Sequence, residues 1–270
     1  MITSTHQLQR PIRSKAIWMH NRVKRVKVAA PVVKKLGFYA ALLTTLLTVV
    51  TFGIAIFTPP FSGPSCTANC FAYPYTDIVS RFPRDYIWMY PAMLLSLVYY
   101  VLMTCVHYLA PPDKRIFSHI GLSCALVSTA VLVINYFLQV SVIQPSLLNG
   151  ETDGIALLSQ FNPHGVFIVL EEVGFLMMSF SVLCMAPVFS GRTTTEKAIR
   201  WLFVANFVLT MLALTFYAVQ YGIGREYRFE IAVITINWFV LMVAGVLLSV
   251  VFKRGAKMSA KLAYLHRPSL

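Results

Sequence analysis

Charged residues are scarce in this chain, and acidic residues are scarcer than basic ones. Of its 270 residues only 12% are charged and only 10 are Asp or Glu, whereas 57% are hydrophobic. A soluble domain carries roughly 25% charged residues, about twice the share in this chain. Water could not cover so apolar a monomer, which excludes a soluble globular enzyme, a disordered chain and a disulfide-rich secreted domain. The composition indicates a polytopic membrane protein.

Signatures of catalysis are missing as well. The sequence contains no G-x-S-x-G, no H-E-x-x-H and no Walker-type glycine loop. The chain also offers no four-ligand set for zinc, because its one C-x3-C pair has no second pair to complete it. The sequence therefore favours a non-enzymatic protein and predicts neither a cofactor nor a metal.

Six stretches are long enough to cross the membrane as helices, which needs about 20 mostly apolar residues each. They are Leu36–Thr58, Tyr86–Leu109, Phe117–Val140, Gly165–Phe189, Trp201–Tyr221 and Ile231–Phe252. Turn-forming residue pairs such as Pro59-Pro60 and Asn149-Gly150 separate them. The predicted fold class is all-α, a bundle of six transmembrane helices at residues 36–252, between a basic arm at 1–35 and a basic tail at 253–270.

The Lys and Arg residues set the predicted orientation. Nine lie in residues 1–35, two in the 110–116 turn, three in the 190–200 loop and five in the tail, whereas the opposite loops hold only four. This asymmetry places both termini in the cytoplasm and explains the net charge of +13 without a nucleic-acid partner. We expect the inner membrane of a bacterium, in keeping with the absence of an N-x-S/T sequon. A mitochondrial inner membrane is the less favoured location.

The basic arm has two interpretations. Its apolar residues recur at helical spacing, and no acid precedes Asp77. One interpretation is an amphipathic helix lying on anionic inner-leaflet lipids, with each basic residue contributing ~1 kcal/mol. The other is a basic tail that only enforces the topology.

Two adjacent acids, Glu171 and Glu172, fall inside the predicted fourth span. They follow His164 by seven and eight residues, about 10–12 Å into the membrane at ~1.5 Å per residue. An acid at membrane depth costs ~2.5–3.5 kcal/mol on insertion and is a functional hypothesis by default. We expect His164 at the outer mouth as a candidate pH-sensitive gate. The neighbouring spans are predicted to complete one polar layer with Asn135, Gln139, Asn237 and Tyr217.

This layer has two functional interpretations. In the first, it binds a small molecule or an ion, and at least one glutamate is protonated near neutral pH because a low-dielectric interior disfavours its charge. Such a site would suit proton-coupled work. In the second, the layer only joins helices through hydrogen bonds worth roughly 0.6–2 kcal/mol each. The protein would then be a non-catalytic scaffold or sensor whose basic arm recruits a partner.

The glutamate pair resembles the start of the E-E-x-x-x-R motif of CAAX-protease-like membrane proteases. Leu176 stands where that motif requires Arg, and after His164 only His266 remains to supply the histidines of the later helices. The resemblance therefore covers two residues and does not support a protease.

Cys66 and Cys70 lie in the proline-rich loop between the first two spans. An oxidising outer space would permit a disulfide between them. The other three cysteines fall in spans and are predicted to be small packing residues.

Reporter fusions test the predicted topology. A reporter that is active only outside the cytoplasm should be active at Asn149 and silent at the C-terminus, because the basic loops stay inside. An active C-terminal fusion would contradict the arrangement.

Overall fold

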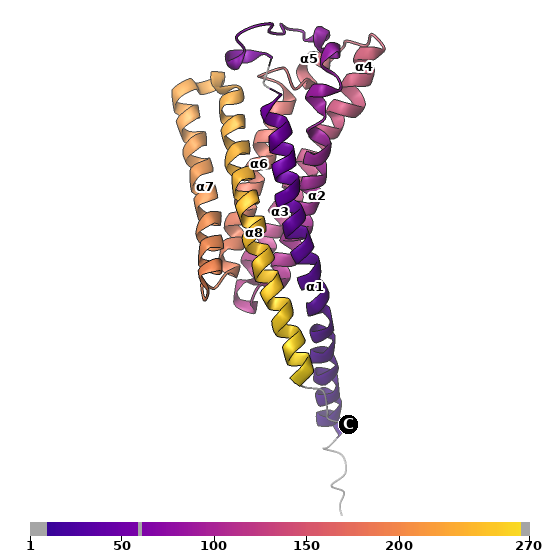
Figure 1. The fold of residues 1–270 in the computed structure, drawn as a ribbon, viewed down its shortest axis with the longest axis vertical. Coiled ribbons are helices and arrows are strands. Elements are labelled where there is room, and N and C mark those ends of the chain that lie inside the picture. The colour runs from indigo at the N-terminus through magenta and orange to yellow at the C-terminus, as the bar shows by residue number, and fades with distance from the viewer. Residues whose placement is uncertain (1–9, 59–60, 266–270) are drawn as a thin grey trace, which may run out of the picture.

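The computed structural model describes the backbone of residues 10–58 and 61–265, and the side chains of residues 31–58, 61–64 and 66–256. Within these residues all regular secondary structure is helical, and six helical segments are long and apolar enough to cross a membrane. The chain therefore forms an all-α, six-helix bundle (Figure 1), which confirms the fold class predicted from hydropathy.

The six segments overlap the six predicted spans. They are Pro31–Ile56 in α1 (Arg10–Ile56), Arg84–Leu109 with α2 (Met89–Leu109), Pro112–Leu148 with α3 (Arg115–Leu138) and α4 (Gln144–Leu148), Val166–Val188 with α6 (Val166–Met185), Thr194–Arg225 with α7 (Thr194–Tyr221), and Tyr227–Ala256 in α8 (Tyr227–Leu265). The short helix α5 (Ile155–Leu158) lies between α4 and α6.

Several helices run past the predicted boundaries for identifiable reasons. Helix α7 begins at Thr194 because Thr193 caps it, its hydroxyl accepting the backbone N–H of Glu196 at 3.2 Å. The third span continues to Leu148 through a π-helical turn at Gln139–Ile143. This turn ends two residues before Pro145, which lacks an N–H and whose ring would clash with a carbonyl four residues earlier in a regular α-helix.

The basic arm enters the bundle as part of one helix. Helix α1 begins at Arg10 and continues to Ile56 with Pro31 inside it. The side chains before Pro31 lie outside the described residues, so the predicted contact of the arm with anionic lipids stays a prediction. The start of the predicted arm, residues 1–9, is likewise outside them.

Five of the helices close a ring. Helix α1 packs against α2 and α8, α3 packs against α2 and α6, and α6 contacts α8 (Figure 1). Helix α7 packs against α6 and α8 and is the least buried of the six spanning segments. Helix α1 begins and α8 ends at the same end of the bundle.

Helices α1 and α8 come closest in the half of the bundle that carries this end. At Gly245 an added Cβ would lie 2.6 Å from the backbone oxygen of Ala41, so only glycine permits the approach. Thr45 strengthens the contact, since its hydroxyl donates to the backbone oxygen of Met242 at 3.2 Å. In the opposite half, between the last turn of α1 and the first turns of α8, the two helices border a cavity.

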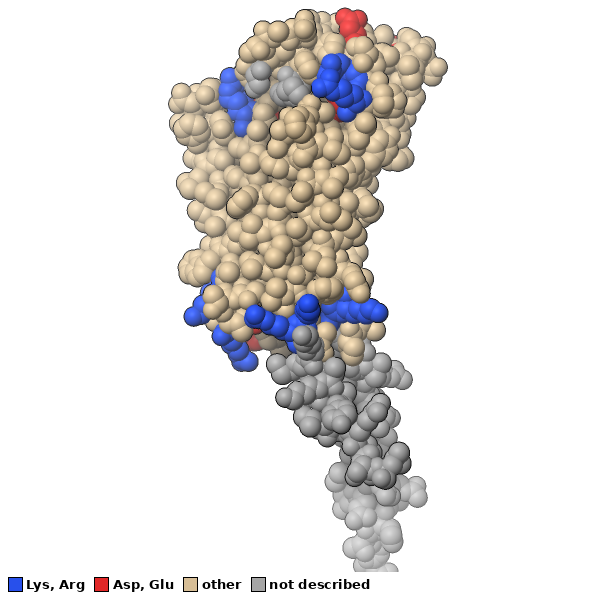
Figure 2. Space-filling view, viewed as in Figure 1, with Lys and Arg blue, Asp and Glu red and all other residues tan. Residues whose placement is uncertain are grey.

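The surface has the charge distribution of a membrane-spanning bundle. In the face shown in Figure 2, a wide uncharged band separates Lys and Arg residues at one end from a few charged residues at the other. We call the band of Lys and Arg residues at one end the basic belt, and the opposite end the outer end.

Candidate ligand-binding site

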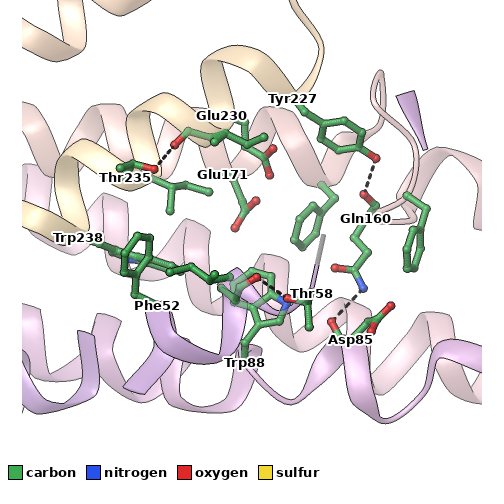
Figure 3. Close-up of a pocket in the computed structure, with 16 residues that line it drawn as sticks. Phe52, Thr58, Asp85, Trp88, Gln160, Glu171, Tyr227, Glu230, Thr235 and Trp238 are labelled. Atoms are coloured by element: carbon green, nitrogen blue, oxygen red, sulfur yellow. Dashed lines mark hydrogen bonds between the residues drawn. The ribbon is translucent and has the colours of Figure 1, made fainter. Parts of the chain in front are cut away.

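A cavity of about 460 Å³ lies in the outer half of the bundle. Ligand pockets in proteins typically measure about 300–1,000 Å³, so a small organic molecule would fit. Its walls come from α1, α6, α8 and the segments that lead into α2 and α6 (Figure 3). Six aromatic side chains contribute to these walls: Phe52, Trp88, Phe161, Phe167, Tyr227 and Trp238.

Two buried carboxyl groups from different helices line this cavity. Glu171 of α6 is 1% exposed and Glu230 of α8 is 7% exposed. Their carboxyl groups point toward one another (Figure 3). Tyr136 of α3 donates its hydroxyl to Glu171 Oε1 at 2.6 Å. The other oxygen, Glu171 Oε2, has no donor among the described residues.

Glu172 points away from this pair, as expected for adjacent residues on a helix. It forms a bidentate ion pair with Arg225, whose Nε lies 3.3 Å from Oε1 while Nη2 contacts Oε2. Only neutral partners were expected from the sequence, because no basic residue lies inside a predicted span. Arg225 lies just past α7, in the turn Gly222–Arg225, and its long side chain reaches the carboxyl from there.

The amide side chains predicted to complete the layer bind elsewhere. Asn135 donates to the backbone oxygen of Phe167 at 2.9 Å, and Gln139 donates to that of Leu158 at 2.7 Å. Gln139 also accepts the backbone N–H of Gln160 at 3.1 Å. Asn135 therefore joins the third span to the first turn of α6, whereas Gln139 holds the irregular segment before α6, where the backbone lacks helical partners.

Asn237 belongs to a second polar group, between α6, α7 and α8. Its oxygen accepts hydrogen bonds from Ser179 at 3.2 Å and from Asn206 at 3.3 Å. Thr210 joins through Ser179 at 3.0 Å. Tyr217 is only partly buried and stacks on Tyr221, with ring centroids 6.0 Å apart. The structure thus brings neither Asn237 nor Tyr217 into hydrogen-bonding contact with the glutamates.

His164 lies at the outer end, beside the turn that precedes α8. Its Nε2 is 3.5 Å from Glu226 Oε1, and its side chain is 63% exposed. The helix begins after it, at Val166, with Gly165 as the N-cap residue. The side chain of Asn162 accepts the backbone N–H of His164 at 2.9 Å and so shapes the turn before the helix.

The outer loops cover this end of the bundle. Ser62 donates to the backbone oxygen of Phe161 at 2.5 Å and contacts the Tyr227 hydroxyl at 2.7 Å. Tyr227 in turn donates to the backbone oxygen of Gln160 at 3.1 Å. In the same loop as Ser62, Cys66 and Cys70 form a disulfide with Cα atoms 5.8 Å apart.

The acids at the outer end differ in whether a basic side chain lies beside them. Among the described residues, five acids there are buried or half-buried. Three have a basic partner: Asp85 with Arg81 at 2.6 Å, Glu172 with Arg225, and Glu226 with His164. The remaining two are the pair that faces the cavity, Glu171 and Glu230.

Sequence reasoning missed Glu230, and with it the facing pair. The predicted sixth span began at Ile231, which left Glu230 in a loop, whereas α8 begins at Tyr227. A helical signal was present, since Glu230 precedes Asn237 by seven residues and so shares its face. Tyr136 gave no comparable signal, because a single tyrosine in a span is common in membrane helices.

The fold and its surface define the chain as a multi-pass membrane protein. Comparisons with models of known protein families, with curated proteins and with solved structures find no match to it. Its function therefore has to be argued from the geometry of the cavity.

The ion pair between Glu172 and Arg225 gives a directional prediction. The Glu172 side chain is 6% exposed and that of Arg225 is 35% exposed. Arg225→Gln strands a buried carboxyl and should lower the free energy of unfolding by about 3 kcal/mol. Glu172→Gln leaves an arginine that can turn to water and should cost about 1 kcal/mol or less.

Unfolding of the purified protein in detergent measures both variants. The double variant Glu172→Gln/Arg225→Gln should be more stable than Arg225→Gln alone, because no buried charge is left unpaired. Equal costs for the two single variants, or additive costs in the double variant, would contradict the assigned ion pair.

Proposed function

We propose that this protein binds a small molecule in the outer cavity and handles it across the membrane, with the Glu171–Glu230 pair exchanging a proton. One observation carries the proposal: two buried acids that have no basic partner among the described residues line a cavity of about 460 Å³. Ionisable groups inside a membrane bundle are costly to bury, and function is the usual reason for their presence.

The proton follows from the geometry of the pair. Two carboxylates that face each other in a low-dielectric interior repel, so a proton between them, or a cation brought by a ligand, is needed to hold them together. Tyr136 from α3 supports this arrangement by donating to Glu171 from the side away from the cavity. Glu172 does not compete for the role, because Arg225 already neutralises it.

A structural role accounts for the second polar group better than for the first. Asn237, Ser179, Asn206 and Thr210 join three helices by hydrogen bonds among themselves. The alternative function, a scaffold or sensor with a structural polar layer, is compatible with that group. It gives no reason for two buried acids to face each other beside a cavity.

The charge distribution of the sequence supports an orientation for this activity. With the basic ends of the bundle in the cytoplasm, the cavity and its covering loops face the outer side. We also propose a bacterial inner membrane, in keeping with the absence of an N-x-S/T sequon.

A cavity-filling variant tests the proposal with any small molecule that the cavity binds. Thermal unfolding in detergent would be followed for the wild type with a panel of cationic, neutral and anionic small molecules. A bound molecule at about 100 times its Kd stabilises by about 2.7 kcal/mol. Ala55 of α1 lines the cavity, so Ala55→Phe should abolish the stabilisation.

Leu46→Phe serves as the matched control, since Leu46 lies on the same helix and is 59% exposed. Stabilisation by some members of the panel in the wild type and in Leu46→Phe, but not in Ala55→Phe, would support the proposal. No stabilisation of the wild type by any member, or equal stabilisation of Ala55→Phe, would contradict it.

A further inference from the structure

We infer that the cavity takes an organic cation, an ammonium group on an apolar body, and that this ligand enters from the bilayer between α1 and α8. The inference rests on the proposed function and adds the chemical class and the route of the ligand. It is carried by the charges, the aromatic rings and the exposed residues that line the cavity.

The charged residues that line the cavity are all acidic. The cavity is lined by Asp85, Glu171 and Glu230, and by no Lys, Arg or His of the described residues. Asp85 is paired with Arg81, which leaves the two glutamates uncompensated. An anionic ligand would be repelled here, whereas one ammonium group would take the place of the shared proton and leave the pair with the same net charge.

Aromatic rings face the same space. Trp238 lies with its ring centroid 5.7 Å from that of Phe52 and 6.3 Å from that of Trp88. In Figure 3 these three rings lie on one side of the cavity and the two carboxyl groups on the other. Ring faces attract organic cations by ~0.5–2 kcal/mol each, and aromatic cages are a common way to bind quaternary ammonium groups.

A metal ion fits this lining less well than an organic cation. The described residues contain no group of three or more His, Cys, Asp or Glu side chains that could hold a metal. A bare ion would also leave most of the 460 Å³ cavity empty and the aromatic walls of the cavity without a partner. The volume instead matches an ammonium group together with an apolar body.

The mouth of the cavity points to the bilayer as the source. Ile56 at the end of α1 is 59% exposed and Ile231 in α8 is 45% exposed, yet both line the cavity. Thr235, one turn further along α8, is also exposed and lines it. The outer loops bind Tyr227, which also lines the cavity, through Ser62 and Gln160. An amphiphilic cation in the outer leaflet could therefore enter sideways between the two helices.

Two probes of the same shape separate charge from apolar fit. Phenyltrimethylammonium and its neutral isostere tert-butylbenzene would be titrated into the full-length protein in detergent, with binding followed by calorimetry and tryptophan fluorescence. The wild type should bind the cation at least about tenfold more tightly, equivalent to about 1.4 kcal/mol. The variant Glu171→Gln/Glu230→Gln should lose that preference and keep its affinity for tert-butylbenzene.

The double variant Glu172→Gln/Arg225→Gln is the matched control, because it removes two charges next to the site without changing the net charge. It should keep the preference for the cation within about twofold. If Glu171→Gln/Glu230→Gln does not fold, Glu230→Gln alone replaces it, since it keeps the contact between Tyr136 and Glu171.

The outcomes separate this inference from the proposed function. Equal affinity for the two probes, or an unchanged preference in Glu171→Gln/Glu230→Gln, would overturn the cationic class. Binding of neither probe would overturn it as well. A ligand from the broader panel that stabilises the wild type but not Ala55→Phe would still uphold the cavity as the binding site.

Discussion

The organisation of the outer half of this protein depends on two carboxyl groups that face each other inside an apolar bundle. Glu171 and Glu230 come from helices that are distant in sequence and adjacent in space. Every other buried or half-buried acid at this end of the described chain has a basic partner. A charge left unpaired in such surroundings is expensive, which is why we propose that the pair shares a proton or holds a cation.

The packing of α1 against α8 determines where that pair can meet a ligand. Gly245 lets the two backbones approach in the half near the basic belt, and the hydroxyl of Thr45 bonds across the interface. Toward the outer end the ring centroids of Phe52 and Trp238 lie 5.7 Å apart, and both rings line the cavity. Close contact at one end of the helix pair thus leaves room for a small molecule at the other.

Hydropathy was enough to predict the six spans, because apolar length is the property that a bilayer selects. The same reasoning found Glu171 and Glu172, which interrupt an apolar run. It did not find Glu230, because an acid beside a span boundary looks like a loop residue until the first turn of the helix is known. The ion pair between Arg225 and Glu172 could not be predicted from the sequence either, because it depends on how the long arginine side chain folds back toward the bundle.

The predicted polar layer shows a related limit. Asn135 and Gln139 were expected beside the glutamates from their positions along the third span, but position along a span does not specify a partner. Gln139 bonds to backbone groups of the irregular segment before α6, which need hydrogen bonds that no helix supplies, and Asn135 bonds to the backbone oxygen of Phe167 in the first turn of α6. Hydrogen bonds to backbone groups therefore engage the two amide side chains that the sequence analysis had assigned to the glutamates.

Infrared difference spectroscopy of the carboxyl groups tests the central claim most directly, because a protonated carboxyl has a carbonyl band distinct from that of a carboxylate. Near neutral pH and without added ligand, the wild type should show such a band from the Glu171–Glu230 pair, and the band should shift in heavy water. It should disappear in Glu171→Gln/Glu230→Gln and persist in Glu172→Gln/Arg225→Gln. A wild-type spectrum without the band, or one that Glu171→Gln/Glu230→Gln leaves unchanged, would contradict a shared proton at this site.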